Sequence, residues 1–185
     1  MRASYLIGFD SRKAAQIAAF FLGMQPGMEK LKLIKLIYLS EREFVGRFGH
    51  PMIYDELYSL KDGPICSSTL SGINGTLEDP YWSQLVRVDQ NNRNVHLVTE
   101  VGRDALDEVS DAEIDVLSHV WGRFGTFTAS QIRKWTHKNC PEYAEVTKGR
   151  LPITYRDLAE AVGREDGQRV ELEIAHSRRM ASLFS

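Results

Sequence analysis

The chain has 185 residues, of which 43% are hydrophobic and 26% are charged, and its formal net charge is −2. These values are typical of one compact globular domain, and the small net charge gives no overall attraction to nucleic acid or to an anionic membrane. The two cysteines, Cys66 and Cys140, do not make a disulfide framework, which favours a reducing cytoplasm. The apolar run from Ala14 to Met24 is too short to span a bilayer.

Two helices are predicted in the first fifty residues. Ser11 can cap a first helix over residues 12–22. In the second, apolar residues from Leu31 to Leu39 are interrupted only by two lysines and cover almost the whole circumference. A helix of this kind should be enclosed by other elements, so we expect it to be the buried centre of the fold. Gly49 can end it in the left-handed conformation.

The segment after Gly49 is predicted to contain two further short helices. The first is expected around Asp55–Leu60 and is followed by the turn Lys61–Pro64, in which the glycine supplies a permissive backbone. Ser67 can then cap a helix that runs through Ile73.

The second half of the chain combines one predicted hairpin with several capped helices. Leu85–Val88 and Val95–Val98 favour β structure and are separated by a polar tract, which predicts a β-hairpin lying against the helices. Three helix starts are marked by the capping pairs Ser110/Glu113, Thr128/Gln131 and Thr154/Asp157. A charged periodic segment covers residues 170–183. We therefore predict a mainly α, compact multi-helix single domain over residues 1–185, with one small β-hairpin.

The residues give no motif for catalysis or for a cofactor. No glycine loop has the spacing and the lysine that bound phosphate needs, and no serine lies in a glycine-flanked nucleophile turn. His137 and Cys140 have a spacing that two metal ligands could use, but a zinc site needs further ligands and the other histidines are scattered. Cys66 could act as a nucleophile if the following helix lowered its pKa, whereas a buried inert thiol is the simpler interpretation. We expect no catalytic residue, no metal and no cofactor.

Residues 112–138 support an alternative hypothesis, because two capped helices joined by a short turn resemble a helix-turn-helix. The second helix is made basic by four residues: Arg133, Lys134, His137 and Lys138. A recognition helix needs polar side chains aimed at base edges and phosphate contacts around them. Its apolar face would serve equally well as core, and the whole chain lacks a basic footprint. A DNA-binding regulator with Arg133, Lys134 and Lys138 as contacts is thus the alternative, while nucleic acid is not the expected partner.

Four short motifs follow one another in the first third of the chain: Lys32–Tyr38, Gly49–Met52, Asp55–Tyr58 and Asp62–Ile65. This ordered set resembles the Panacea domain, the domain of SocA-like antitoxins that also occurs in prophage-associated proteins. The likeness continues more loosely to Thr136-His137 and Pro141–Tyr143, so it covers about residues 11–150 and leaves 151–185 as a C-terminal helical extension. The family usually has a tyrosine before the glycine of the fourth motif, where this chain has Asp62.

The resemblance implies a non-enzymatic, cytoplasmic antitoxin of a bacterial or prophage toxin–antitoxin pair. The implied partner is a cognate protein toxin, which the chain would neutralise by direct contact. An adaptor that presents the toxin to a protease is a variant of the same role, and a second copy of the chain is a further candidate partner. Family members serve with chemically unrelated toxins, so the resemblance does not identify the toxin.

The central lysines have two interpretations. By ordinary side-chain physics, Lys32 and Lys35 would bury their stems and leave their ammonium groups in water, and Glu41, Arg42 and Glu43 would form a solvated face. The family resemblance instead implies that Lys35 and Tyr38, together with Asp62, Gly63 and Pro64, form a polar pocket that serves partner binding.

Overall fold

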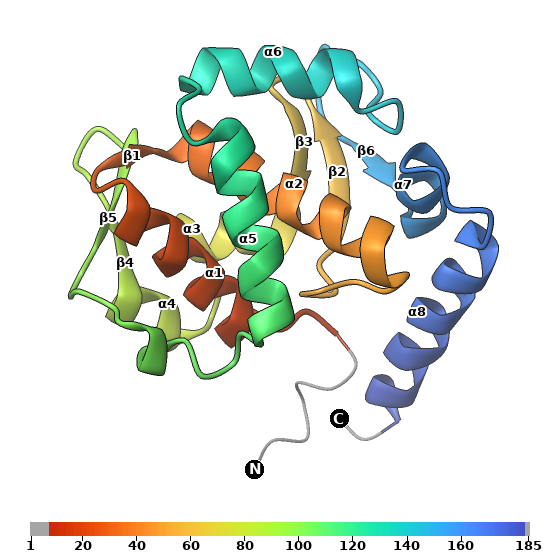
Figure 1. Ribbon diagram of the computed structural model, residues 1–185, viewed down its shortest axis with the longest axis horizontal. Helices are drawn as coiled ribbons and strands as arrows, with labels where there is room; N and C mark the ends of the chain where they lie inside the picture. Colours follow the sequence, from red (N-terminus) through yellow and green to blue (C-terminus); the bar gives the residue numbers. More distant parts are fainter. Residues whose placement is uncertain (1–7, 184–185) are drawn as a thin grey trace.

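The computed structural model describes residues 8–183, which are built around one buried helix (Figure 1). This helix, α2 (Lys30–Phe48), is buried without interruption from Lys32 to Glu41. Four other helices pack against it: α1 (Ser11–Met24), α5 (Asp111–Phe124), α6 (Ala129–Asn139) and α7 (Tyr155–Ala161). The mainly α class and the enclosed central helix are therefore confirmed.

The ends of the first two helices show how local sequence sets their limits. The carboxylate of Asp10 accepts the backbone N–H of Lys13 at 3.1 Å and so caps α1. Ser11 is the first residue of that helix, so the prediction that it is the cap was wrong by one residue. Gly49 follows α2 with φ = 74°, the left-handed conformation predicted for it.

Capping boxes begin three of the later helices as predicted. Both reciprocal hydrogen bonds are present at Ser110/Glu113 before α5, at Thr128/Gln131 before α6 and at Thr154/Asp157 before α7. The helix α3 (Ser67–Ile73) differs, because Ser67 is its first residue and not its cap. Its free N–H groups at Ser68 and Thr69 are instead bound at 2.8 Å by the distant carboxylate of Asp55.

The predicted hairpin belongs to a three-stranded antiparallel sheet. Its strands are β1 (Met28–Glu29), β5 (Asn94–Leu97) and β4 (Val86–Val88), in the order β1-β5-β4. Val95 of the central strand pairs with both Met28 and Val88. The hairpin is confirmed as β4–β5, and β1 joins it without a sequence signal because two residues have no readable period.

The prediction of a helix around residues 55–60 was wrong, because this segment contains a strand of a second three-stranded sheet. The order is β3-β2-β6, with strands β3 (Gly63–Cys66), β2 (Leu57–Leu60) and β6 (Leu151–Ile153). Along β2, Leu57 and Ser59 are buried while Tyr58 and Leu60 are half-buried, which is the alternation of a strand. Four residues are too few for this period to be separated from a helical one in the sequence.

The remaining elements complete one continuous hydrophobic core. They are α4 (Pro80–Leu85), a 3₁₀ turn (Arg103–Ala105) and α8 (Gly167–Ser182). Figure 1 shows α6 across one end of the molecule and α8 along an edge, where it packs on α7. Ile17, Leu36, Val120 and Leu158 all belong to the same buried cluster. Over residues 8–183, no helix combines the length and hydropathy needed to cross a bilayer.

Candidate functional site

Lys35, in the second turn of α2, is a fully buried lysine, with 0% of its surface exposed. Its Nζ donates a hydrogen bond to the carbonyl of Pro64 at 2.7 Å. Burial lowers the pKa of this amine to about 7, and the negative charge of Asp62 opposes the lowering. Lys32 is also buried and donates to the carbonyl of Gly125 at 2.6 Å. The expectation that the ammonium group reaches water is therefore wrong for Lys35.

The turn between β2 and β3 approaches Lys35 so closely that any residue larger than glycine would be strained there. Gly63 has φ = 102°, which L side chains rarely adopt. A Cβ atom there would lie 3.0 Å from Lys35 Nζ and 3.1 Å from Thr136 Oγ1. The structure thus brings Lys35 and the Gly63-Pro64 turn together, as the family resemblance implied, and α6 completes the contact through Thr136.

Tyr38 lies one turn further along α2 and belongs to an adjacent cluster. Its hydroxyl donates to Glu142 Oε1 at 2.8 Å, and Arg42 Nε donates to the same oxygen at 2.7 Å. Burial raises the pKa of the Tyr38 hydroxyl, and the neighbouring carboxylate of Glu142 adds to the rise. Sequence reasoning missed Glu142 and the pairing of Arg42, since the two residues are separated by 100 positions.

Asp62 connects the buried contact to the molecular surface. Its side chain is 60% exposed, and its Oδ1 lies 3.0 Å from Arg133 Nε on α6. The residues of the expected polar pocket and the basic residues of α6 are therefore neighbours. Lys35, Gly63 and Pro64 lie beneath α6, and the basic side chains lie on its outer face. One helix separates the polar interior from solvent at this end of the molecule.

The outer face of α6 carries a shallow basic hollow of about 350 Å³, which we call the α6 hollow. It is lined by Arg133, Lys134, His137 and Lys138. Both lysines are exposed, while the ring of His137 lies against Tyr143 with 4.5 Å between centroids. Burial, followed by the charges of Arg133 and Lys35, lowers the pKa of His137, so the imidazole is held in its neutral form more strongly than usual.

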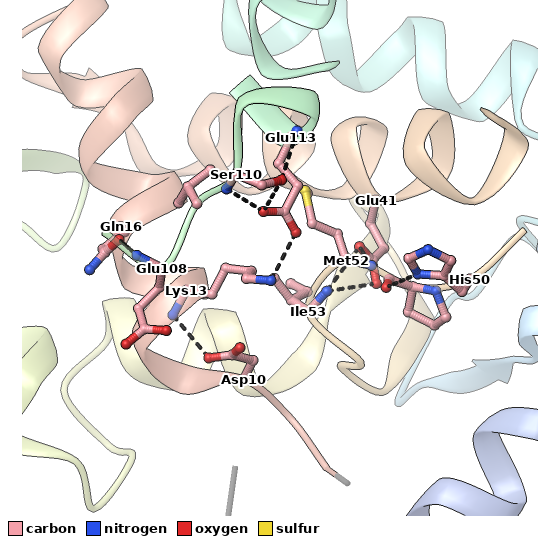
Figure 2. A network of polar contacts seen from close by, with 12 residues as sticks. Asp10, Lys13, Gln16, Glu41, His50, Met52, Ile53, Glu108, Ser110 and Glu113 are labelled. Atoms are coloured by element: carbon pink, nitrogen blue, oxygen red, sulfur yellow. Dashed lines mark hydrogen bonds and ion pairs between the residues drawn. The ribbon is translucent and has the colours of Figure 1, made fainter. Parts of the chain in front are cut away.

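Glu41 is a second buried charge that the sequence did not reveal. None of its surface is exposed, so the expectation of a solvated face is wrong for this residue. Figure 2 shows its carboxylate directed at the backbone of Met52 and Ile53, and Oε2 accepts the Met52 N–H at 2.9 Å. The Tyr155 hydroxyl donates to Oε1 at 2.9 Å. Burial raises the pKa of Glu41 to about 7 against these hydrogen bonds.

Figure 2 also shows a polar joint between α1 and α5. Lys13 Nζ donates to Glu113 Oε1 at 2.8 Å, and the other oxygen of Glu113 accepts from the Ser110 backbone in the capping box. The Lys13 amine and both carboxylate oxygens of Glu113 therefore have hydrogen-bond partners within the protein. The joint therefore holds two helices together and offers no free nucleophile or base.

Both cysteines, Cys66 and Cys140, are free thiols buried in the protein. Burial raises the pKa of Cys140 to about 12 and also raises that of Cys66 well above its ordinary value. A thiolate, which is the reactive form, is therefore disfavoured at both positions. Among residues 8–183, no group of three or more His, Cys, Asp or Glu side chains is placed to hold a metal ion.

The chain matches a known protein family. A family model described as the antitoxin SocA-like Panacea domain matches residues 33–142, which is more than half of the chain. The matched region begins in α2 and ends at Glu142. It therefore includes Lys35 and the turn it contacts, the α6 hollow, and the hydrogen bond between Tyr38 and Glu142. No curated protein and no solved structure matches the chain.

Proposed function

Because the chain belongs to the family of SocA-like antitoxins with a Panacea domain, we propose that it is an antitoxin that neutralises a cognate protein toxin by direct binding. The observation that carries the proposal is the family match over residues 33–142. The matched region supports a binding role physically, since α6 packs on both α2 and β3, which Lys35 joins through its hydrogen bond to Pro64. A surface that is already rigid loses little entropy when a partner docks.

We also propose that the chain acts by binding and not by catalysis, in the cytoplasm. The inert environment of Cys66 and Cys140 and the satisfied polar joints support binding, and two free buried thiols suit a reducing compartment. Lys35, Tyr38 and the Asp62-Gly63-Pro64 turn would then act from inside, by positioning α6 for the partner. A complex with a second copy of the chain is compatible with this role.

Co-expression with the products of adjacent genes tests the proposal. Each product is expressed alone and together with the chain, and we expect one that arrests growth and is rescued by the chain. Lys35→Glu and Gly63→Val should weaken rescue, because both disturb the contact beneath α6, whereas exposed Arg87→Glu on β4 serves as the control. The proposal fails if no neighbouring product is both toxic alone and rescued. Loss of the toxin in rescued cells would indicate delivery to a protease, a variant of the same role.

One observation favours DNA binding as the second candidate function. The α5–turn–α6 pair exists, and α6 directs Lys134 and Lys138 into solvent beside Arg133. Against it, Arg133 is tied to Asp62, and the net charge of −2 opposes approach to a polyanion. A gel shift on the chain's own promoter, abolished by Arg133→Ala with Lys134→Ala, would support this candidate.

A further inference from the structure

The α6 hollow is lined by basic side chains alone. Its four residues occupy positions 133, 134, 137 and 138, which repeat at the i, i+4 spacing and therefore share one face of the helix. Along the helix axis they cover about 8 Å, at 1.5 Å per residue. Two successive turns thus present a compact cationic surface.

Most of the acidic groups near the α6 hollow are already paired or buried. Asp62 is paired with Arg133, while Glu142 is bound by Arg42 and Tyr38 and its side chain is 0% exposed. Glu145 is exposed on the loop after α6, where its charge acts on His137. One acidic residue does not neutralise this surface, which carries two exposed lysines.

Lys134 and Lys138 stand apart from the other cations of the site. The side chain of neither lysine takes part in an ion pair or a side-chain hydrogen bond with a residue in the range 8–183. Beneath them, the amine of Lys35 is buried and carries a partial positive charge near neutral pH, because its pKa is about 7. A charge in the interior is poorly screened, so it adds to the positive potential on the outer face.

His137 supplies a second, independent feature of the α6 hollow. Its Nε2 is shielded from solvent and has no hydrogen-bond partner of regular geometry among the described residues, although the backbone of Asp62 is near enough to act on its pKa. Buried polar nitrogens are nearly always hydrogen-bonded in a completed structure. Because this nitrogen is closed to solvent, a carboxylate bound to the two exposed lysines would act on the imidazole through its charge and not through a hydrogen bond to Nε2.

We propose that the α6 hollow is the docking surface for an acidic segment of the protein partner, with Lys134 and Lys138 pairing its carboxylates. The inference rests on the proposed antitoxin function and adds the chemistry of the contact. A protein segment fits better than a duplex. The surface is two helical turns long, it includes His137, which packs on the half-buried ring of Tyr143, and it belongs to a chain of net charge −2.

The first test uses a chemical probe and does not require the toxin. A fluorescent hexaglutamate peptide is titrated into the chain at low ionic strength, and a random-sequence duplex DNA is titrated in parallel. We expect the peptide to bind and Lys134→Glu or Lys138→Glu to weaken it by about tenfold, since reversing one charge turns attraction into repulsion. Arg87→Glu is the matched control because it is exposed, changes the net charge equally and lies on β4. In NMR titrations, peptide binding should raise the pKa of His137.

Two results of this test would overturn the inference. One is a peptide affinity that is absent, or equal in wild type, both lysine variants and the control. The other is duplex DNA that binds more tightly than the peptide and depends on the same two lysines, which would assign the surface to nucleic acid.

The second test separates this inference from the proposed function. Wild type, Lys134→Glu and Arg87→Glu are each co-expressed with the toxic neighbour. Rescue by wild type and by Arg87→Glu, but not by Lys134→Glu, supports the acidic contact. Equal rescue by all three leaves the antitoxin function standing and refutes the docking surface. No rescue by wild type refutes the proposed function itself, while the peptide test still decides the chemistry of the α6 hollow.

Discussion

Replacing Lys35 by methionine should remove a specific dependence of stability on pH. The side chain is fully buried, and methionine keeps its length and apolar stem without the amine. The variant leaves the Pro64 carbonyl without its donor, but it also removes the need to bury a cation. These two effects oppose each other at neutral pH. The informative quantity is therefore how the difference between the two proteins changes with pH.

The magnitude follows from proton linkage. In the folded chain Lys35 loses its proton around pH 7, whereas in the unfolded chain it does so near its ordinary value of 10.5. Between these values the unfolded state binds more protons, so the free energy of unfolding rises with pH, by at most about 1.4 kcal/mol per pH unit. From pH 7 to pH 9 the wild type should gain about 2 kcal/mol relative to Lys35→Met.

Urea denaturation at several pH values from 6 to 9 measures this difference. Subtracting the two profiles removes groups common to both proteins, such as the buried tyrosines and cysteines. Lys148→Met, at an exposed lysine, is the control and should follow the wild type. Parallel profiles for wild type and Lys35→Met would refute the reasoning, because they would mean that the amine of Lys35 titrates alike in both states.

Three further substitutions test other parts of the structure. Glu41, with its folded-state pKa of about 7, holds its proton more tightly than in the unfolded chain. The free energy of unfolding of wild type relative to Glu41→Gln should therefore fall by about 2 kcal/mol from pH 5 to pH 7; a constant difference in urea melts would contradict this. Gly63→Ala should cost about 2 kcal/mol, and more than Gly75→Ala, which also has positive φ but an open surrounding. Equal losses in thermal melts would show that crowding by Lys35 is unimportant. Ser110→Ala should cost about 1 kcal/mol by removing the cap of α5, and an unchanged melting temperature would argue against that cap.

The elements that were predicted correctly are those whose signal is local. The all-round apolar pattern of α2 predicts burial wherever its neighbours lie, and the capping boxes before α5, α6 and α7 need only two residues three positions apart. The β4–β5 hairpin likewise depends on two short runs and one turn. The strand β2 was mistaken for a helix, because its state is decided by pairing with β3 and β6, and β6 is about ninety residues away.

The same distinction between local signals and long-range contacts applies to the candidate site. The sequence by itself determined the turn at Gly63 and Pro64, and the meeting of Lys35 with this turn was expected only from the family resemblance. Only the tertiary structure decided the surroundings of the polar and charged groups. It buries Glu41, it places Glu142 where the Tyr38 hydroxyl can donate to it, and it places the α6 hollow above Lys35. The physical reason is that a pKa, an ion pair or a surface potential depends on distance through space. Residues far apart in the chain set these quantities, and no local pattern encodes them.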